Sequence, residues 1–195
     1  MKFKCIIMIL VALVAVSASL HADPYKIATM EFNLIDKDNV DNIKNDTAEI
    51  YATESKKGLQ PFLKWSGDQA TYLILITKEF KKALKKYESW REIALRDDVK
   101  VAKKIARYDT YMMVRAHKTG RCVDCTGEIT CEFLSLKTLT MFLITVTLKH
   151  GNERLKLQYV LSFNDEKPMK LAKIIDDENM KKAIKKEKEI DRKFK

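Results

Sequence analysis

The residues of this chain whose types and spacing permit chemistry are His117, Cys122, Cys125 and Cys131, in the segment HKTGRCVDCTGEITC. Opposed thiols form disulfides, closely spaced thiols exchange electrons, and thiolates together with an imidazole bind zinc. Three interpretations therefore compete, and the local structure that positions the four side chains decides among them.

The interpretation that we favour is a structural disulfide between Cys122 and Cys131. If Thr126 and Gly127 form a two-residue hairpin turn, Cys122 lies opposite Cys131 at a non-hydrogen-bonded position. Directly opposed residues of this kind approach within the Cα separation that a disulfide tolerates. Cys125 is then a free thiol near the turn.

Two alternatives stay open for the same segment. Cys122-Val123-Asp124-Cys125 is a CxxC redox motif, although the segment is rich in β-formers and turn residues and lacks the helix start typical of thioredoxin-like sites. The third interpretation is a zinc site in which His117 joins the three cysteines, with a spacing, H-x4-C-x2-C-x5-C, that is not one of the strong zinc signatures.

The N-terminal residues set the compartment in which these thiols are expected to work. Lys2 and Lys4 precede an apolar run over residues 5–16, and small residues follow up to a preferred cleavage point after Ala22. This order is typical of a secretory signal peptide, and the run is short for a membrane helix. We therefore expect residues 1–22 to be removed and the protein to be exported, periplasmic or secreted, without a transmembrane anchor.

We expect the remaining residues 23–195 to form one domain. Their composition limits the kinds of partner that this domain can bind. Loss of Lys2 and Lys4 lowers the formal net charge from +10, and the remaining positive surplus favours an acidic protein or an anionic envelope surface. Acids and bases are interleaved along most of the chain, which argues against nucleic acid. A lysine-rich surface that serves solubility explains the same surplus.

Hydrophobic periodicity predicts the elements that must position these groups. We expect a strand over 27–35, a loop over 36–46, a weak strand over 47–54 and a connector over 55–65. A long helix then runs from a capping box at Ser66 and Gln69 to Trp90, and a second helix covers 97–107. Strands follow at 108–116, 138–149, 155–163 and 169–175, and a charged helix covers 177–195.

A two-residue turn at Gly151-Asn152 joins two of these strands and would pair Leu148 with Leu155 and Val146 with Leu157. The sequence as a whole predicts an α+β fold, in which a mostly antiparallel sheet with a C-terminal β-meander is packed by helices on one face.

Common catalytic signatures are missing, including the G-x-S-x-G elbow, the P-loop and H-E-x-x-H, and no catalytic residue or cofactor is indicated. The sequence favours a small exported, non-enzymatic protein that binds a partner or ligand; the alternative is a thiol-redox or zinc protein. One softer hint of a ligand-binding rim comes from the aromatic and methionine residues at element ends: Trp65, Trp90, Tyr108, Tyr111, Met112 and Met113.

Overall fold

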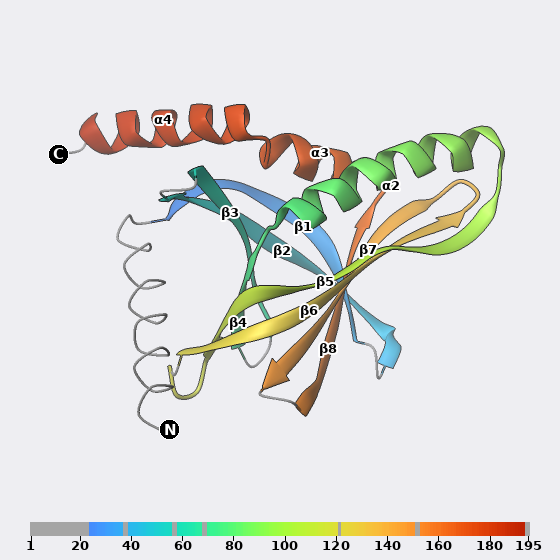
Figure 1. The fold of residues 1–195 in the computed structure, drawn as a ribbon, viewed down its shortest axis with the longest axis horizontal. Coiled ribbons are helices and arrows are strands. Elements are labelled where there is room, and N and C mark those ends of the chain that lie inside the picture. Colours follow the sequence, from blue (N-terminus) through green and yellow to red (C-terminus); the bar gives the residue numbers. More distant parts are fainter. Residues whose placement is uncertain are drawn as a thin grey trace, which may run out of the picture.

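The computed structural model describes residues 24–36, 39–55, 58–67, 70–120, 122–150 and 153–193. Eight antiparallel strands form a closed barrel in which each strand pairs with its neighbours in sequence and β1 pairs with β8 (Figure 1). The strands are β1 (Tyr25–Asp36), β2 (Asn39–Ser55), β3 (Gly58–Ser66), β4 (Ala70–Leu75), β5 (Lys100–Ala116), β6 (Cys122–Leu136), β7 (Thr140–His150) and β8 (Glu153–Asn164).

Alternation along the strands fills the barrel with side chains. Register partners share a face, and the inward face carries pairs such as Ile50 with Leu63 and Ile144 with Leu161, all buried. Aromatic rings occupy much of the interior. The ring of Tyr72 lies 4.9 Å from that of Trp65 and 5.0 Å from that of Tyr159, and the two tyrosine hydroxyls are 2.7 Å apart.

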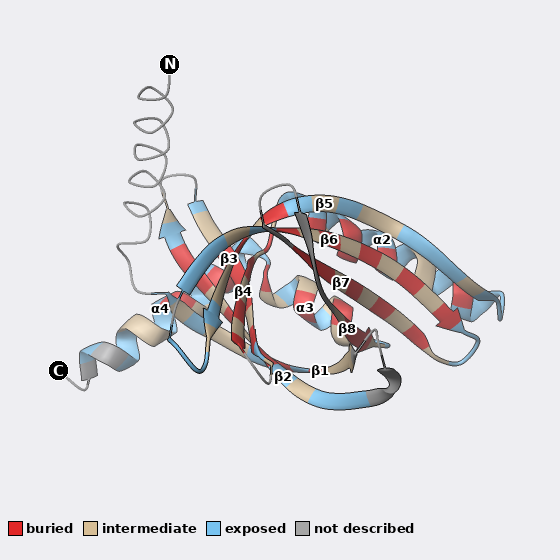
Figure 2. Ribbon diagram, turned by 90° about the horizontal axis from the view of Figure 1, so that it is seen from below, coloured by how far each residue is buried: buried red, intermediate tan, exposed pale blue. Residues whose placement is uncertain are grey.

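Helix α2 (Lys78–Arg96) continues this core outside the strands. Thr77 is its N-cap and accepts a hydrogen bond from the backbone N–H of Phe80. Tyr87 packs edge-on against Phe133 of β6 and Phe142 of β7. The buried face of α2 therefore packs against the inward face of these strands. Figure 2 shows β5, β6 and β7 running alongside the helix.

Two further helices follow the barrel, α3 (Lys167–Ile174) and α4 (Asp177–Lys193). Leu171 of α3 is buried in the main core, whereas α4 packs through Met180 and Ile184 against Ala52 in a small separate cluster. An ion pair of 2.8 Å between Lys81 and Asp177 links α2 to α4.

The predicted fold class is wrong. The described residues form an eight-stranded closed antiparallel barrel with three helices, not a sheet packed by helices on one face. The connector expected over 55–65 holds β3, and the loop expected over 36–46 lies mostly within β1 and β2. The strand predicted over 27–35 lies within β1 and is confirmed.

The long helix predicted from Ser66 to Trp90 combines a strand and a helix. Ser66 ends β3, and β4 follows with Ala70, Tyr72 and Ile74 on its buried face. Because β4 runs almost directly into α2, the apolar positions of the two elements mimic one continuous helical stripe. The proposed capping partner Gln69 lies outside the described residues.

The helix predicted over 97–107 is wrong for a different reason, a β-bulge. Residues 100–116 form β5, whose pairing with β6 shifts between Lys104 and Ala106. The extra residue shifts the period-two pattern, so that Val101, Ile105 and Tyr108 recur at helical spacings of four and three.

The last hairpin is predicted correctly in kind but not in register. His150 pairs with Glu153, and the two residues predicted as the turn lie outside the described residues. An irregularity between Thr147 and Lys149 then shifts the pairing by two from the predicted register. Val146 therefore faces Tyr159, and because the shift is even, Val146 keeps its predicted face. The strand predicted over 169–175 is instead α3, which has Pro168 in its first turn.

Gly127 marks the tightest approach within the barrel. A Cβ atom at this position would lie 1.8 Å from Sδ and 2.8 Å from Cγ of Met112, which is fully buried. We expect Gly127→Ala to lower the free energy of unfolding by about 1–3 kcal/mol, measured by urea denaturation, because Met112 must repack. In a Met112→Ala background the same substitution should cost much less, and an equal cost in both backgrounds would contradict the steric explanation.

Glu49 of β2 accepts hydrogen bonds from Lys26 of β1, Lys64 of β3 and Tyr51. The bonds from Lys26 and then from Lys64 lower the pKa of Glu49 from 4.5 to about 2. Since the folded-state pKa is depressed, the stabilisation is complete above pH 4.5 and is lost as the pH falls toward 2.

For this partly exposed cluster we expect Glu49→Gln to lower the free energy of unfolding at neutral pH by about 0.5–1 kcal/mol. Urea denaturation of both proteins at a series of pH values should show the difference shrinking below pH 4.5. A difference that does not change with pH would mean that the carboxylate charge is not its source.

Candidate functional site

The three cysteines of the predicted cluster are spread along one strand. Cys122, Cys125 and Cys131 all belong to β6, and all three are free thiols. The hairpin expected at Thr126-Gly127 is not formed, because β6 runs straight through these residues and pairs with β5 on one side and β7 on the other.

The predicted Cys122–Cys131 disulfide is therefore not present in this fold. At a rise of about 3.3 Å per residue, the two Cα atoms lie roughly 30 Å apart, whereas a disulfide spans less than about 7 Å. Cys122 and Cys125 are separated by roughly 10 Å by the same reasoning and point to opposite faces of the strand, so they do not form a dithiol pair.

The zinc interpretation also finds no geometric support. His117 lies in the turn after β5, with its Nε2 3.1 Å from Thr71 Oγ1. Within the part of the chain that the structure describes, no three histidine, cysteine or acidic side chains gather as metal ligands would. The structure thus brings none of the four predicted residues together.

The surroundings of the thiols differ. Cys122 is exposed, whereas Cys125 is half-buried, and burial followed by the nearby Asp124 carboxylate raises the pKa of its thiol. Burial raises the pKa of Cys131, on the inward face, to about 12. Cys125 and Cys131 are thereby kept in the protonated, weakly nucleophilic form.

A surface with clearer binding potential lies where α2 ends and β5 begins, and we call it the Trp90 groove. It is a hollow of about 370 Å³ with apolar walls and a lysine rim. It is lined by Trp90, Ile93, Ala94, Val99, Lys100, Val101, Lys103 and Phe133.

Trp90 organises this groove. Its ring packs edge-on against Phe133 at 5.9 Å, which fixes it to the inward face of β6. Lys86 Nζ lies 4.7 Å from the ring centroid and Lys103 Nζ lies 5.7 Å from it. Cation–π contacts hold the two ammonium groups in place without neutralising their charge. Lys103 reaches the ring because it is the register partner of Phe133.

Exposed apolar side chains gather at this end of the molecule, and two of them, Ile93 and Val99, line the groove. Ile93 is 45% exposed and Val99 is 40% exposed, and Leu95 and Leu136 are exposed to a similar degree. Leu136 is the register partner of Lys100, so it lies at the same end of the sheet but on the face of β6 opposite to that of Phe133. Four of the seven large apolar side chains that are exposed among the described residues thus gather at one end of the molecule. Such gathering is typical of an interaction surface.

Two turns hold this end in shape. Asp98, between α2 and β5, and Lys137, between β6 and β7, both adopt positive φ angles, of 50° and 68°. An ion pair of 3.1 Å joins their side chains, and Ser135 Oγ donates a hydrogen bond to the carbonyl oxygen of Val99. In Figure 1 the two turns lie together at the right-hand end. These contacts hold the two turns in place, so the exposed apolar side chains at this end project from a rigid backbone.

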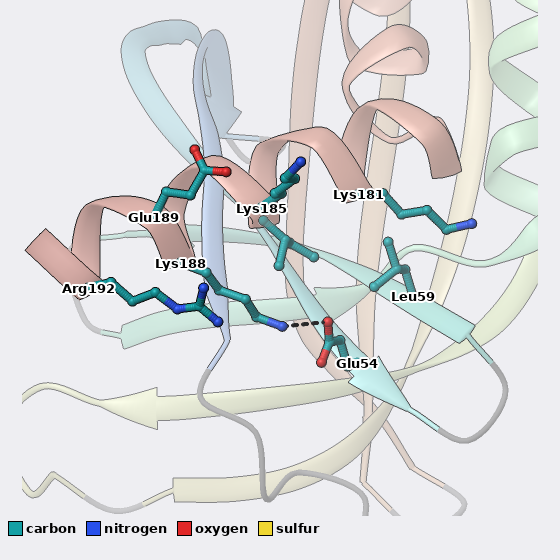
Figure 3. A pocket seen from close by; sticks show the side chains of 8 residues that line it. Glu54, Leu59, Lys181, Lys185, Lys188, Glu189 and Arg192 are labelled. Carbon is teal, nitrogen blue, oxygen red and sulfur yellow. Dashed lines mark hydrogen bonds and ion pairs between the residues drawn. The ribbon is translucent and has the colours of Figure 1, made fainter.

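A second hollow, which we call the α4 pocket, lies between α4 and the β2–β3 hairpin (Figure 3). Its volume is about 350 Å³. It is lined by Glu54, Leu59, Lys181, Ile184, Lys185, Lys188, Glu189 and Arg192. Lys188 forms an ion pair of 2.9 Å with Glu54.

Sequence reasoning found only part of these surfaces. Of the residues suggested as a ligand rim, Trp90 lines the groove, but Trp65 and Met112 are buried in the core. Val99 and Lys103 were missed because they fell in a segment predicted to be helical. A search for apolar residues that alternate with lysines, as in Val99-Lys100-Val101, would have indicated this region.

The thiols should differ in reactivity according to burial. When the folded protein is treated with iodoacetamide at pH 8, we expect Cys122 to be alkylated first, Cys125 more slowly, and Cys131 only after denaturation. Peptide mass spectrometry at successive times measures the order. Early modification of Cys131 in protein that remains folded would contradict the placement of its side chain inside the barrel.

None of the described helices combines the length and apolar character needed to cross a bilayer. In comparisons with protein-family models, curated proteins and solved structures, this chain finds no match.

Proposed function

We propose that the protein is a non-enzymatic binding protein of the cell envelope whose α2–β5 end docks on an anionic lipid surface. The observation that carries the proposal is that Ile93 and Val99, both exposed, line the Trp90 groove together with lysines, while the exposed Leu95 and Leu136 lie at the same end of the molecule. Export, expected from residues 1–22, would bring the protein to such a surface.

The physical chemistry of this end suits a bilayer interface. Apolar side chains that protrude from a rigid end can enter the boundary between headgroups and acyl chains. Lysines just behind them remain at headgroup level, where each contributes roughly 1 kcal/mol with an anionic lipid. Trp90, half-buried at the groove, is a residue type favoured at that depth.

Charge decides in favour of lipid phosphate over a neutral partner. Lys86, Lys100 and Lys103 lie in or beside the groove, and the ring of Trp90 positions two of them. The acids Asp97 and Asp98 at the same end are paired with Arg96 and Lys137. The lysines near the groove are therefore left to attract an anion.

The proposal predicts binding to vesicles of phosphatidylcholine containing about one third phosphatidylglycerol, and little binding to phosphatidylcholine alone. Val99→Asp should reduce the partition coefficient roughly tenfold, because an apolar contact is replaced by a charge that the surface repels. Lys103→Gln should reduce it roughly fivefold. Co-sedimentation at low salt measures both effects.

Matched controls use residues of the same type elsewhere. Ile43 of β2 is 58% exposed and lies outside the groove, so Ile43→Asp should bind vesicles almost as the wild type does. Lys82→Gln on the exposed face of α2 controls for the loss of one charge. If Ile43→Asp weakened binding as much as Val99→Asp, or if the wild type bound neither vesicle, the α2–β5 end would not be a lipid-docking surface.

A further inference from the structure

The α4 pocket gathers four cations on one side of one helix. Lys181, Lys185, Lys188 and Arg192 recur at steps of four, three and four residues, so they share a face of α4 and flank the buried Ile184. Like charges at these spacings repel each other in an isolated helix. This arrangement therefore destabilises α4 unless a negatively charged group lies among the four cations.

The carboxylates of the pocket compensate only part of this charge. Glu54 is bound by Lys188, and Glu189 is the other acid of the lining. Four cations against two acids leave the lining with a net charge of +2. Figure 3 shows the side chains of Lys188 and Arg192 both extending toward Glu54 on the pocket side of α4.

The pocket is anchored well enough to hold a ligand. Met180 and Ile184 pack against Ala52, and the ion pair to Glu54 fixes Lys188. Lys188 Nζ also lies 5.2 Å from the centroid of the Tyr25 ring, so one cation of the pocket has a defined position in the free protein. The other cations extend from the same helix.

From this arrangement we infer that the α4 pocket binds a small soluble polyanion carrying phosphate groups. Phosphate oxygens accept charge-assisted hydrogen bonds from lysine and arginine, and two linked phosphates would span several of the four cations. A hollow of about 350 Å³ has room for a pyrophosphate group and a small attached body resting on Leu59 and Ile184. This site is separate from the proposed lipid surface, since α4 and the α2–β5 turn lie at opposite ends in Figures 1 and 2.

Titration calorimetry with sodium pyrophosphate at low salt tests the inference. Wild-type protein should bind it saturably at one site. Lys185→Gln/Arg192→Gln should weaken binding roughly five- to thirtyfold, because two exposed ionic contacts are lost. The control Lys182→Gln/Lys186→Gln removes the same charge from exposed positions of α4 outside the pocket and should stay within about twofold of the wild type.

A third variant gives a change of opposite sign. Glu54→Gln raises the net charge of the lining and frees Lys188, so it should bind pyrophosphate more tightly than the wild type. Equal weakening by the two double variants would show a diffuse charge effect, and no saturable binding, or an unchanged affinity in Glu54→Gln, would also overturn the inference. Thermal unfolding of each variant verifies that α4 remains docked.

A competition arm separates free phosphates from lipid headgroups. Pyrophosphate should bind Val99→Asp as it binds the wild type, and phosphatidylglycerol vesicles should leave pyrophosphate binding to that variant intact. If vesicles displaced pyrophosphate from Val99→Asp, the pocket would recognise a lipid phosphate, and the assignment to a soluble ligand would be wrong. Failure of the lipid-docking proposal alone leaves this result unaffected.

Discussion

Closure of an eight-stranded barrel around side chains is the constraint on which this structure depends. A barrel of this size has an interior just wide enough to be filled by its own side chains. Here aromatic rings do much of the filling: Trp65 stacks on Tyr72, Tyr159 is tilted against Tyr72, and Phe32 stacks on Phe163. Closure also pairs β1 with β8, so the sheet is continuous around the barrel. The two hollows described above consequently lie where helices meet the ends of strands.

Helix α2 connects the filled interior to such a surface. Phe80 and Tyr87 pack on Phe142, and one turn later Trp90 packs on Phe133. The same row of aromatic contacts that fixes the helix thus ends in a half-exposed ring at the groove. Phe133 holds the Trp90 ring in a fixed position. Two lysines can therefore contact the outer part of the ring without the loss of side-chain freedom that ordering a mobile ring would cost.

The elements that sequence reasoning predicted correctly are those whose pattern is set by one local period, such as β1 and α4. It failed where two elements adjoin without a turn, as at β4 and α2, or where a bulge shifts the period, as at Lys104–Ala106. The disulfide hypothesis was wrong for a related reason, because it relied on a local sequence pattern alone. Gly127 looked like a turn residue, yet it is needed because Met112 lies against its Cα, a contact between strands that no local pattern reveals. The Trp90 groove was missed since Val99 and Lys103 fell in a segment predicted to be helical, and Phe133 joins them only through the pairing of β5 with β6.

The ion pairs of this basic protein leave positive charge uncompensated at the Trp90 groove and at the α4 pocket. Many of the acids serve to join elements: Glu31 holds α3 through Lys167, Asp177 holds α2 through Lys81, and Glu49 joins three strands. Each such pair neutralises a lysine. At the Trp90 groove the lysines are held by an aromatic ring instead, and a cation–π contact leaves the charge of the ammonium uncompensated. At the α4 pocket four cations share two acids. The two proposed anion-binding surfaces therefore differ from the ion pairs elsewhere in one respect: their cations either contact an aromatic ring or outnumber the carboxylates beside them.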